Sequence, residues 1–452
     1  MMRWSNALRI RACCWLAVLL FLSLPHGFEA AELSLRITPD APPEGDKVLR
    51  LEDAVRIGLE NHPRIRAARE KVGAQQAVLG QEFSAYYPTI TFNNFYRTTT
   101  ASGTTSTADR GFDFYSSQAR FEMILYNFGK REGTVQSARN TVEATRYDLT
   151  ATASDVVLAV RQNFYTYLQA RAVVRVREET VKDRELIVRQ AQGFYEVGTR
   201  PRIDVARAES NLFNARADLI AAQNAVRIAW TNLKNSMGVV DFPERPLAEE
   251  LTITPARVSL DEAKEAAFAS RPELRSFQAQ RKAQDEKIAV ARRSHLPDIL
   301  FNADYGRRNS SRRREGDPDT FPLQPTWTVQ LSFKIPIFEG FRTTYKVQEA
   351  LRNYHSIRAQ EEDRRQQVAL EVEQSYLRLL EAEERIKATE AAMRAAKENL
   401  DLANGRYQVG VGTIIEVTDA QTLYTDAQTN HIRSLYDHKI AEAQLIRAMG
   451  RQ

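Results

Sequence analysis

Histidine and cysteine, which often bind metals or take part in catalysis, are few in this chain. The two nearest of the six histidines, His431 and His438, are seven positions apart. In a helix that spacing separates them by about 10 Å, too far for both to bind one metal ion. Both cysteines, Cys13 and Cys14, lie in the first 30 residues, so later residues offer no thiol nucleophile. We therefore expect no enzyme, no metal site and no bound cofactor.

Charged side chains of both signs stand near two glycine-containing turns. The first turn, Val197-Gly198-Thr199, is followed by Arg200 and Asp204, and the second, Val409-Gly410-Val411, by Glu416 and Asp419. Acidic residues in the first turn of a helix complement the helix dipole, and this could be their whole purpose. The glycines could equally serve only to reverse the chain, because the residue after a helix often needs a left-handed conformation.

The overall composition excludes several classes of protein. The 452 residues include 63 Lys and Arg against 58 Asp and Glu, a net charge of +5 that does not favour a dedicated nucleic-acid binder. Apolar residues make up 43%, while the 19 Gly and 16 Pro are scarce, which is typical of long helices rather than disorder.

Residues 1–30 have the organisation of a secretory signal peptide. Arg3, Arg9 and Arg11 precede an apolar run from Cys13 to Leu24, and small residues follow at Ala30 and Ala31. Beyond residue 31 no apolar stretch approaches the length that a membrane-spanning helix needs.

The rest of the chain contains an internal duplication. The segment from Ala191 to Gly238 aligns with Ala403 to Gly450 without a gap; both contain Tyr-x-Val-Gly and both end in Met-Gly. Residues Leu51 to Tyr87 likewise align with Leu260 to Leu296. The sequence therefore predicts two structural repeats, residues 51–238 and 260–450.

Each repeat contains two segments with the period of a β-strand. In the last of them Trp327, Val329, Leu331 and Phe333 alternate with polar residues. One apolar face over about 10 residues is typical of a transmembrane barrel strand, although a soluble antiparallel sheet with one wet face would give the same pattern. We predict strands at about 88–98, 115–126, 297–306 and 327–337.

The helical segments of each repeat match one another in length. Repeat 1 predicts helices at about 51–61, 63–86, 130–194 and 201–237, and repeat 2 at about 260–270, 272–295, 342–406 and 413–449. A proline-free helix of about 65 residues would reach nearly 100 Å, and the two medium helices placed end to end would nearly match it. Each repeat thus predicts a rod in which one long helix runs antiparallel to two shorter helices placed end to end.

Four strands cannot close a barrel. Two copies of the chain would supply eight strands, whose interior side chains would fill, whereas three would supply twelve around an open lumen. A homotrimer is the smallest assembly that both closes and conducts.

In this arrangement of motifs the chain resembles the TolC family of outer-membrane efflux proteins. The resemblance rests on the strand-to-helix segments YNFGKR (126–131) and IFEGFR (337–342), the NHP and SRP breaks (61–63 and 270–272), and the two turns. It implies a mainly α fold with a transmembrane β portion, in which a trimeric helical barrel continues a twelve-stranded β-barrel. It also implies an equatorial belt formed by residues 31–50 and the inter-repeat linker 239–259.

The resemblance further implies function, partners and location. The protein would be the outer-membrane exit duct of a tripartite efflux or type I secretion machine, extending into the periplasm and gated at its periplasmic tip. Its partners would be a periplasmic adaptor (membrane fusion) protein, an inner-membrane transporter of the RND or ABC type and outer-membrane lipid, but no nucleic acid. The alternative function is a non-conducting scaffold that spans the periplasm. The sequence does not identify the substrate that would be exported.

The resemblance also assigns roles at the turns. Val197, Gly198, Thr199, Val409, Gly410 and Val411 would be the tips that dock the adaptor. Asp204, Glu416 and Asp419 match the family's acidic rings at the periplasmic constriction, where rings of carboxylates would favour cations. Arg200 could latch its tip to a neighbouring carboxylate, whereas Gly412 stands where many family members have an arginine.

Overall fold

The computed structural model describes residues 48–101, 110–249, 251–253, 258–312 and 323–451. The predicted signal peptide and residues 31–47 of the predicted N-terminal equatorial segment lie outside the described residues.

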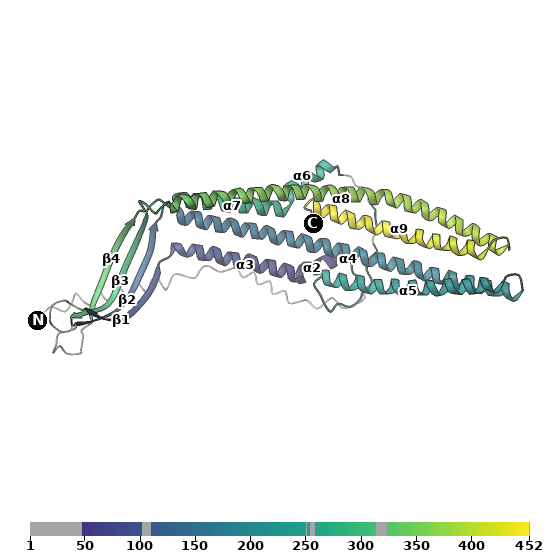
Figure 1. Cartoon of the computed structure of the whole chain (residues 1–452), viewed down its shortest axis with the longest axis horizontal. Coiled ribbons are helices and arrows are strands. Elements are labelled where there is room, and N and C mark those ends of the chain that lie inside the picture. The colour runs from purple at the N-terminus through teal and green to yellow at the C-terminus, as the bar shows by residue number, and fades with distance from the viewer. Residues whose placement is uncertain (1–47, 102–109, 250, 254–257, 313–322, 452) are drawn as a thin grey trace. The chain divides into compact units, whose positions relative to one another are not determined.

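The helices of the two repeats correspond one to one (Figure 1). Repeat 1 contains α2 (Leu51–Asn61), α3 (Pro63–Phe83), α4 (Lys130–Glu196) and α5 (Arg202–Ser236), and repeat 2 contains α6 (Leu260–Ser270), α7 (Pro272–Arg293), α8 (Arg342–Gln408) and α9 (Ile414–Ala448). A 3₁₀ turn, η1 (Ser84–Tyr86), takes the place of the last residues expected in α3. Pro63 and Pro272 open α3 and α7, since proline has a helical φ and lacks the N–H that a first turn leaves unbonded.

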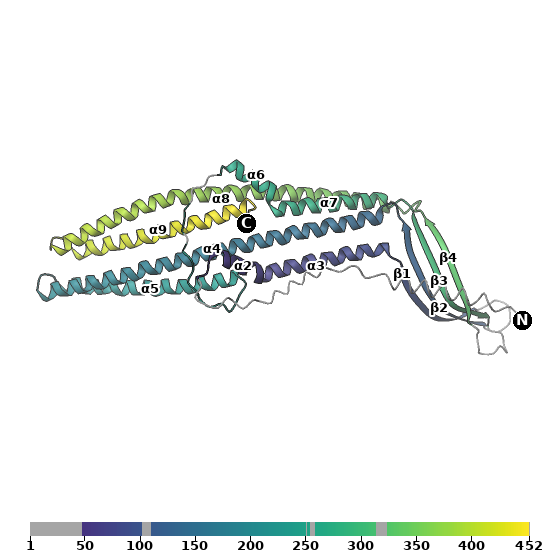
Figure 2. The same cartoon turned by 180° about the vertical axis from the view of Figure 1, so that it is seen from behind.

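The two long helices, each of 67 residues, organise the packing. Helix α4 packs against α5 and α3 of its own repeat and against α7 and α9 of repeat 2, and α8 packs against α7 and α9 (Figures 1 and 2). The repeats therefore share one packed body instead of folding as two separate units.

The strands form one antiparallel sheet in the order β1-β2-β3-β4. Its members are β1 (Thr89–Ala101), β2 (Arg110–Tyr126), β3 (Asp298–Arg312) and β4 (Gln324–Lys334). Strand β2 begins earlier than the alternation predicted, and β3 ends later. Backbone pairing continues in both places: β1 pairs with β2 as far as Arg110, and β2 pairs with β3 as far as Arg312. Strand β4 ends at Lys334, not at residue 337; Pro336 has no N–H to give to a ladder.

The sheet has one apolar and one polar face. Leu331 pairs with Phe301 and Val329 with Ala303 on the apolar face, yet Leu331 is 68% exposed in the single chain. On the other face Arg120 forms an ion pair with Asp304 across β2 and β3, with 2.7 Å between Nε and Oδ1. Within the described residues β1 and β4 each have a strand partner on one side only.

The strand-to-helix segments have the same backbone turn in both repeats. Phe128 and Phe341 have positive φ values of 56° and 63°, and each precedes the first turn of a long helix. The motifs that carried the family resemblance therefore mark the points where the chain leaves the sheet.

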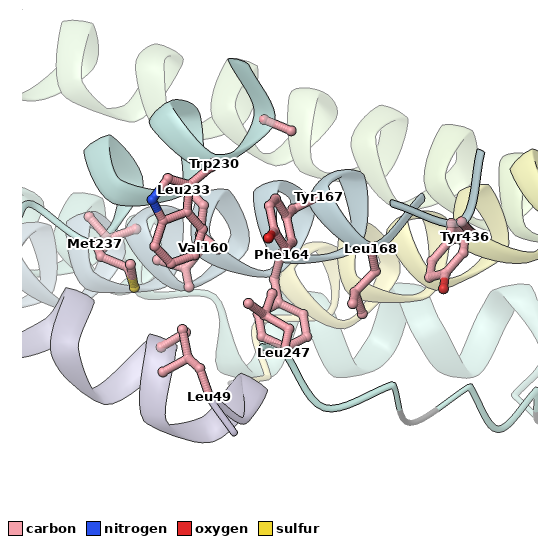
Figure 3. Close-up of a cluster of buried hydrophobic side chains, with 14 of the residues drawn as sticks. Leu49, Val160, Phe164, Tyr167, Leu168, Trp230, Leu233, Met237, Leu247 and Tyr436 are labelled. Carbon is pink, nitrogen blue, oxygen red and sulfur yellow. The ribbon is translucent and has the colours of Figure 1, made fainter. Parts of the chain in front are cut away.

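A cluster of large apolar side chains holds the middle of α4 (Figure 3). Phe164 and Tyr167 of α4 pack there with Trp230 of α5. Leu49 and Leu247 join the cluster from outside the helices, through a bridge between the segment before α2 and the inter-repeat linker. The described parts of the two predicted equatorial segments thus meet at the same level of the helices.

Among the described helices, none is both long and apolar enough to cross a membrane.

Candidate functional site at the hairpin tips

The two turns that end the α4–α5 and α8–α9 hairpins have nearly the same geometry. Gly198 and Gly410 have φ values of +75° and +86°, and each donates its N–H to a carbonyl of the preceding helix. A Cβ built on either glycine would meet nothing within 4 Å, so glycine is required for the backbone conformation and not for space. Both turns lie at the helix ends far from the sheet (Figures 1 and 2).

The side chains at the summit of the turns are exposed and apolar. Val197, Val409 and Val411 are each more than two-thirds exposed in the single chain. Exposed valines clustered on a turn offer a small apolar contact surface to another protein.

Arg200 joins the two turns to one another. Its Nη2 donates to the carbonyl oxygens of Gly410 at 3.0 Å and Gly412 at 2.7 Å, and its guanidinium lies 5.4 Å from the centre of the Tyr407 ring. Within the single chain Arg200 therefore binds backbone carbonyls of the second turn, and the neighbouring carboxylate expected from the sequence stays a prediction. We call Arg200 and these two carbonyls the tip clamp.

Gly412 is confined by its own turn. A Cβ at this position would come within 2.9 Å of Arg406 Cβ and of the Tyr407 nitrogen. A side chain at residue 412 would therefore displace the backbone of its own turn.

The three predicted gate carboxylates have different surroundings. Glu416 is held locally, since its backbone N–H bonds to the Thr413 hydroxyl and its carboxylate pairs with Arg406 at 3.3 Å. The Asp419 carboxylate is exposed and forms no hydrogen bond or ion pair with any residue that the structure describes, although its charge acts on Arg184. Asp204 lies near the Tyr407 ring and acts on it through its charge. Glu416 thus has the structural role expected of a first-turn acid, whereas Asp419 does not.

Beneath the turns the four hairpin helices enclose an apolar cluster, the tip core. It consists of Ile187, Val188, Ala191, Ala208, Leu212, Leu400, Ala403, Tyr407, Ile414, Val417 and Ala420. Tyr407 is 1% exposed and packs edge-on against Phe194 at 5.6 Å between ring centres. Burial, and secondarily the charge of Asp204, raises the pKa of Tyr407.

Two polar residues of this region were not among the predicted site residues. Arg184 of α4 is 7% exposed and donates to Thr418 and Thr422 of α9, and Gln421 of α9 is buried nearby. The sequence contained a signal for the first of these: Arg184 precedes Ile187, Val188 and Ala191 at three-, four- and seven-residue spacing, and so lies on the buried stripe of its helix.

The tips thus present exposed apolar side chains together with charged groups of both signs. Within the described part of the chain, no group of three or more His, Cys, Asp or Glu side chains could hold a metal ion. The tip clamp and the tip core both connect the second hairpin to the first.

Comparison with known proteins finds the same organisation elsewhere. A family model described as "Outer membrane efflux protein" matches residues 55–239 and 264–451, one match in each repeat. The outer membrane protein TolC of Vibrio cholerae is 23% identical over 399 residues, which cover 86% of this chain and 88% of that protein.

Solved structures share the fold. A membrane protein from Pseudomonas aeruginosa superposes with a TM-score of 0.77 at 20% identity, covering 89% of this chain and 90% of that one. The CmeC outer membrane channel of Campylobacter jejuni superposes with a TM-score of 0.75 at 17% identity, covering 88% and 85%.

Proposed function

This chain belongs to the outer membrane efflux protein family, and we propose that it is the gated exit duct of an export machine that spans the periplasm. The family resemblance inferred from the sequence is confirmed, as are the duplication and the mainly α fold with a four-stranded sheet. The protein is located in the outer membrane and extends into the periplasm.

One observation carries the proposal: a sheet with an exposed apolar face and two unpaired edges is fused to two long hairpins. Leu331 and its neighbours present that face to the surroundings, and β1 and β4 lack an outer partner within the described residues. Lipid suits the apolar face, and the strands of further copies suit the edges. Three copies would give twelve strands around an open lumen, with the Arg120–Asp304 pair facing the inside.

Exposed apolar residues on the helices support assembly from copies of the chain. Phe213 and Ile220 are exposed on α5, and Leu370 and Leu377 on α8, each pair two helical turns apart. Helices α5 and α8 belong to different hairpins, so each protomer would offer one apolar stripe on either side. Packing α5 of one copy against α8 of the next would cover exposed apolar side chains on both helices, at different levels, and continue the closure of the sheet into a helical barrel.

The gate is the narrow end of this barrel. In a trimer Asp204, Glu416 and Asp419 would each be present three times. Glu416 pairs with Arg406, whereas Asp419 acts on the buried Arg184 through its charge without forming an ion pair. The tip clamp would keep the second hairpin drawn against the first in the resting state. Export would need the clamp to open, with the energy supplied by the partners and not by this chain.

The partners follow from the same geometry. The exposed valines of the two turns would receive a periplasmic adaptor protein, which would in turn connect the duct to an inner-membrane transporter of the RND or ABC type. The described residues leave the cargo open.

Conductance of the purified protein in a planar bilayer tests the proposal, together with the triple variant D204A/E416A/D419A. We expect a small, cation-selective conductance that increases or loses selectivity in the variant, because the carboxylates set the charge of the constriction. A folded trimer without conductance in either form would favour the periplasm-spanning scaffold. Equal conductance in both forms would leave the duct intact and remove these residues from the gate.

A further inference from the structure

A charged residue occupies a core position beneath the tips. Arg184 shares the buried stripe of α4 with Ile187, Val188 and Ala191, and only 7% of it is exposed. Burying a guanidinium is costly unless nearly all its donors are bonded and a counter-charge lies close.

Both hydrogen bonds that the Arg184 side chain donates go to α9, which belongs to the other repeat. The Nη2 of Arg184 donates to the Thr418 carbonyl at 3.3 Å and to Thr422 Oγ1 at 2.9 Å. Yet the Thr422 hydroxyl already donates to the Thr418 carbonyl at 2.8 Å, so these two groups satisfy one another without the arginine. Helix α9 would lose no obligatory hydrogen-bond partner if Arg184 were replaced.

The rest of the guanidinium is poorly compensated. The buried Nη1 has no hydrogen-bond acceptor among the described residues. The carboxylates of Asp183 and Asp419 act on Arg184 through their charges, but neither forms an ion pair with it. Burial is the largest influence and lowers the pKa of Arg184.

Two more buried polar atoms in the same region also lack a hydrogen-bond partner among the described residues. The Tyr407 hydroxyl and the Gln421 Oε1 are buried and lack hydrogen-bond partners in the described part of the chain. All three groups are already covered within one chain, so a second copy that docks on the outside of the helices cannot reach them. Separation of the two hairpins would expose them to water and satisfy them.

We propose that Arg184 is a positioning residue of the gate that favours opening, because its charge is better solvated when α9 moves away from α4. The inference rests on the proposed gate and gives it a regulation: the tip clamp holds the hairpins together, and the buried guanidinium beneath it works against that closure. Helix α9 would therefore separate from α4 more readily once a partner releases the tip clamp.

The variant R184M tests this idea, because methionine fills a similar volume without a charge. Replacing a buried ion by an apolar side chain is commonly neutral or stabilising. We expect amide hydrogen exchange of α9 around residues 417–422 to slow about tenfold in the assembled protein, and the open probability in bilayers to fall by roughly the same factor. R184K retains a charge and should remain close to the unmodified protein in both measurements.

The matched control is R189M, which removes an exposed arginine from the same helix and should change neither measurement. Faster exchange in R184M, or failure of R184M to assemble, would mean that Arg184 braces the closed tip and would overturn the inference. Unchanged exchange and open probability would overturn it as well. Absence of conductance in the unmodified protein would instead refute the duct, while the exchange rates would still decide how Arg184 acts on the packing of the tip.

Discussion

Replacing Arg200 by alanine should open the resting channel. Arg200 is the one described side chain that hydrogen-bonds the turn of hairpin 1 to the turn of hairpin 2, through the carbonyl oxygens of Gly410 and Gly412. R200A removes both bonds and the contact with the Tyr407 ring, but the tip core beneath remains. The hairpins should therefore separate more often at the tip without loss of the fold.

The size of the effect follows from these contacts. A hydrogen bond from a charged donor contributes about 1.5–3 kcal/mol when buried, and Arg200 is only half-buried, so about 1 kcal/mol for each bond is appropriate. A guanidinium over an aromatic ring adds about 0.5 kcal/mol. The sum of about 2–3 kcal/mol corresponds to a roughly 30- to 160-fold shift toward the open state.

Single-channel recording of the purified trimer measures this shift as open probability. R200K is the informative partner variant: an ammonium donates without the planar fork of the guanidinium, so it should hold the two carbonyls less well and give an intermediate value. R202A removes an exposed arginine two residues away and should leave the open probability unchanged.

Two results would refute the reasoning. An open probability in R200A equal to that of the unmodified protein would mean that the clamp contributes nothing to closure. An equal increase in R200A and R202A would mean that positive charge near the first turn matters, and not the bonds to the second turn.

Further predictions concern the turns and the helix core. Leucine at Gly198 and Gly410 would have to adopt the left-handed backbone of these turns, which costs roughly 1–2 kcal/mol for each residue. We expect the variant to lose transport in cells while cross-linking still detects the trimer. Normal transport would exclude these turns as docking tips. Glu273 of α7 accepts a hydrogen bond from Arg447 of α9. Burial alone would raise the pKa of Glu273, but the charge of Arg447 holds that pKa below its usual value. The stability that Glu273 contributes is therefore present above about pH 4.3 and is lost as the pH falls further. The melting temperature should decline less steeply between about pH 5 and pH 3 in E273Q than in the unmodified protein, and parallel declines would contradict this assignment.

The sequence alone predicted the architecture because the features that encode it are local and repeated. Helix periodicity, Pro63 and Pro272 at helix starts, and glycines at the reversals each depend on neighbours within a few residues. Duplication made every such signal available twice, and the family match in both repeats confirms it.

Strand ends were predicted less well, because a strand continues wherever its partner supplies backbone groups. Strand β2 extends back to Arg110 because β1 pairs with it as far as Ala101, and β3 extends to Arg312 because it pairs with Phe112 of β2. The early end of β4 before Pro336 was, in contrast, legible from one residue.

Only the tertiary structure decided what the tip residues contact. Arg200 lies in one repeat and its carbonyl partners in the other, about two hundred positions away, and Arg184 reaches Thr418 and Thr422 across a similar distance in the sequence. No local pattern specifies such pairings, since they depend on how α9 packs against α4. The charges near the turns were visible in the sequence, but whether each is bonded, buried or free to act on the lumen is set by the packing of the two hairpins.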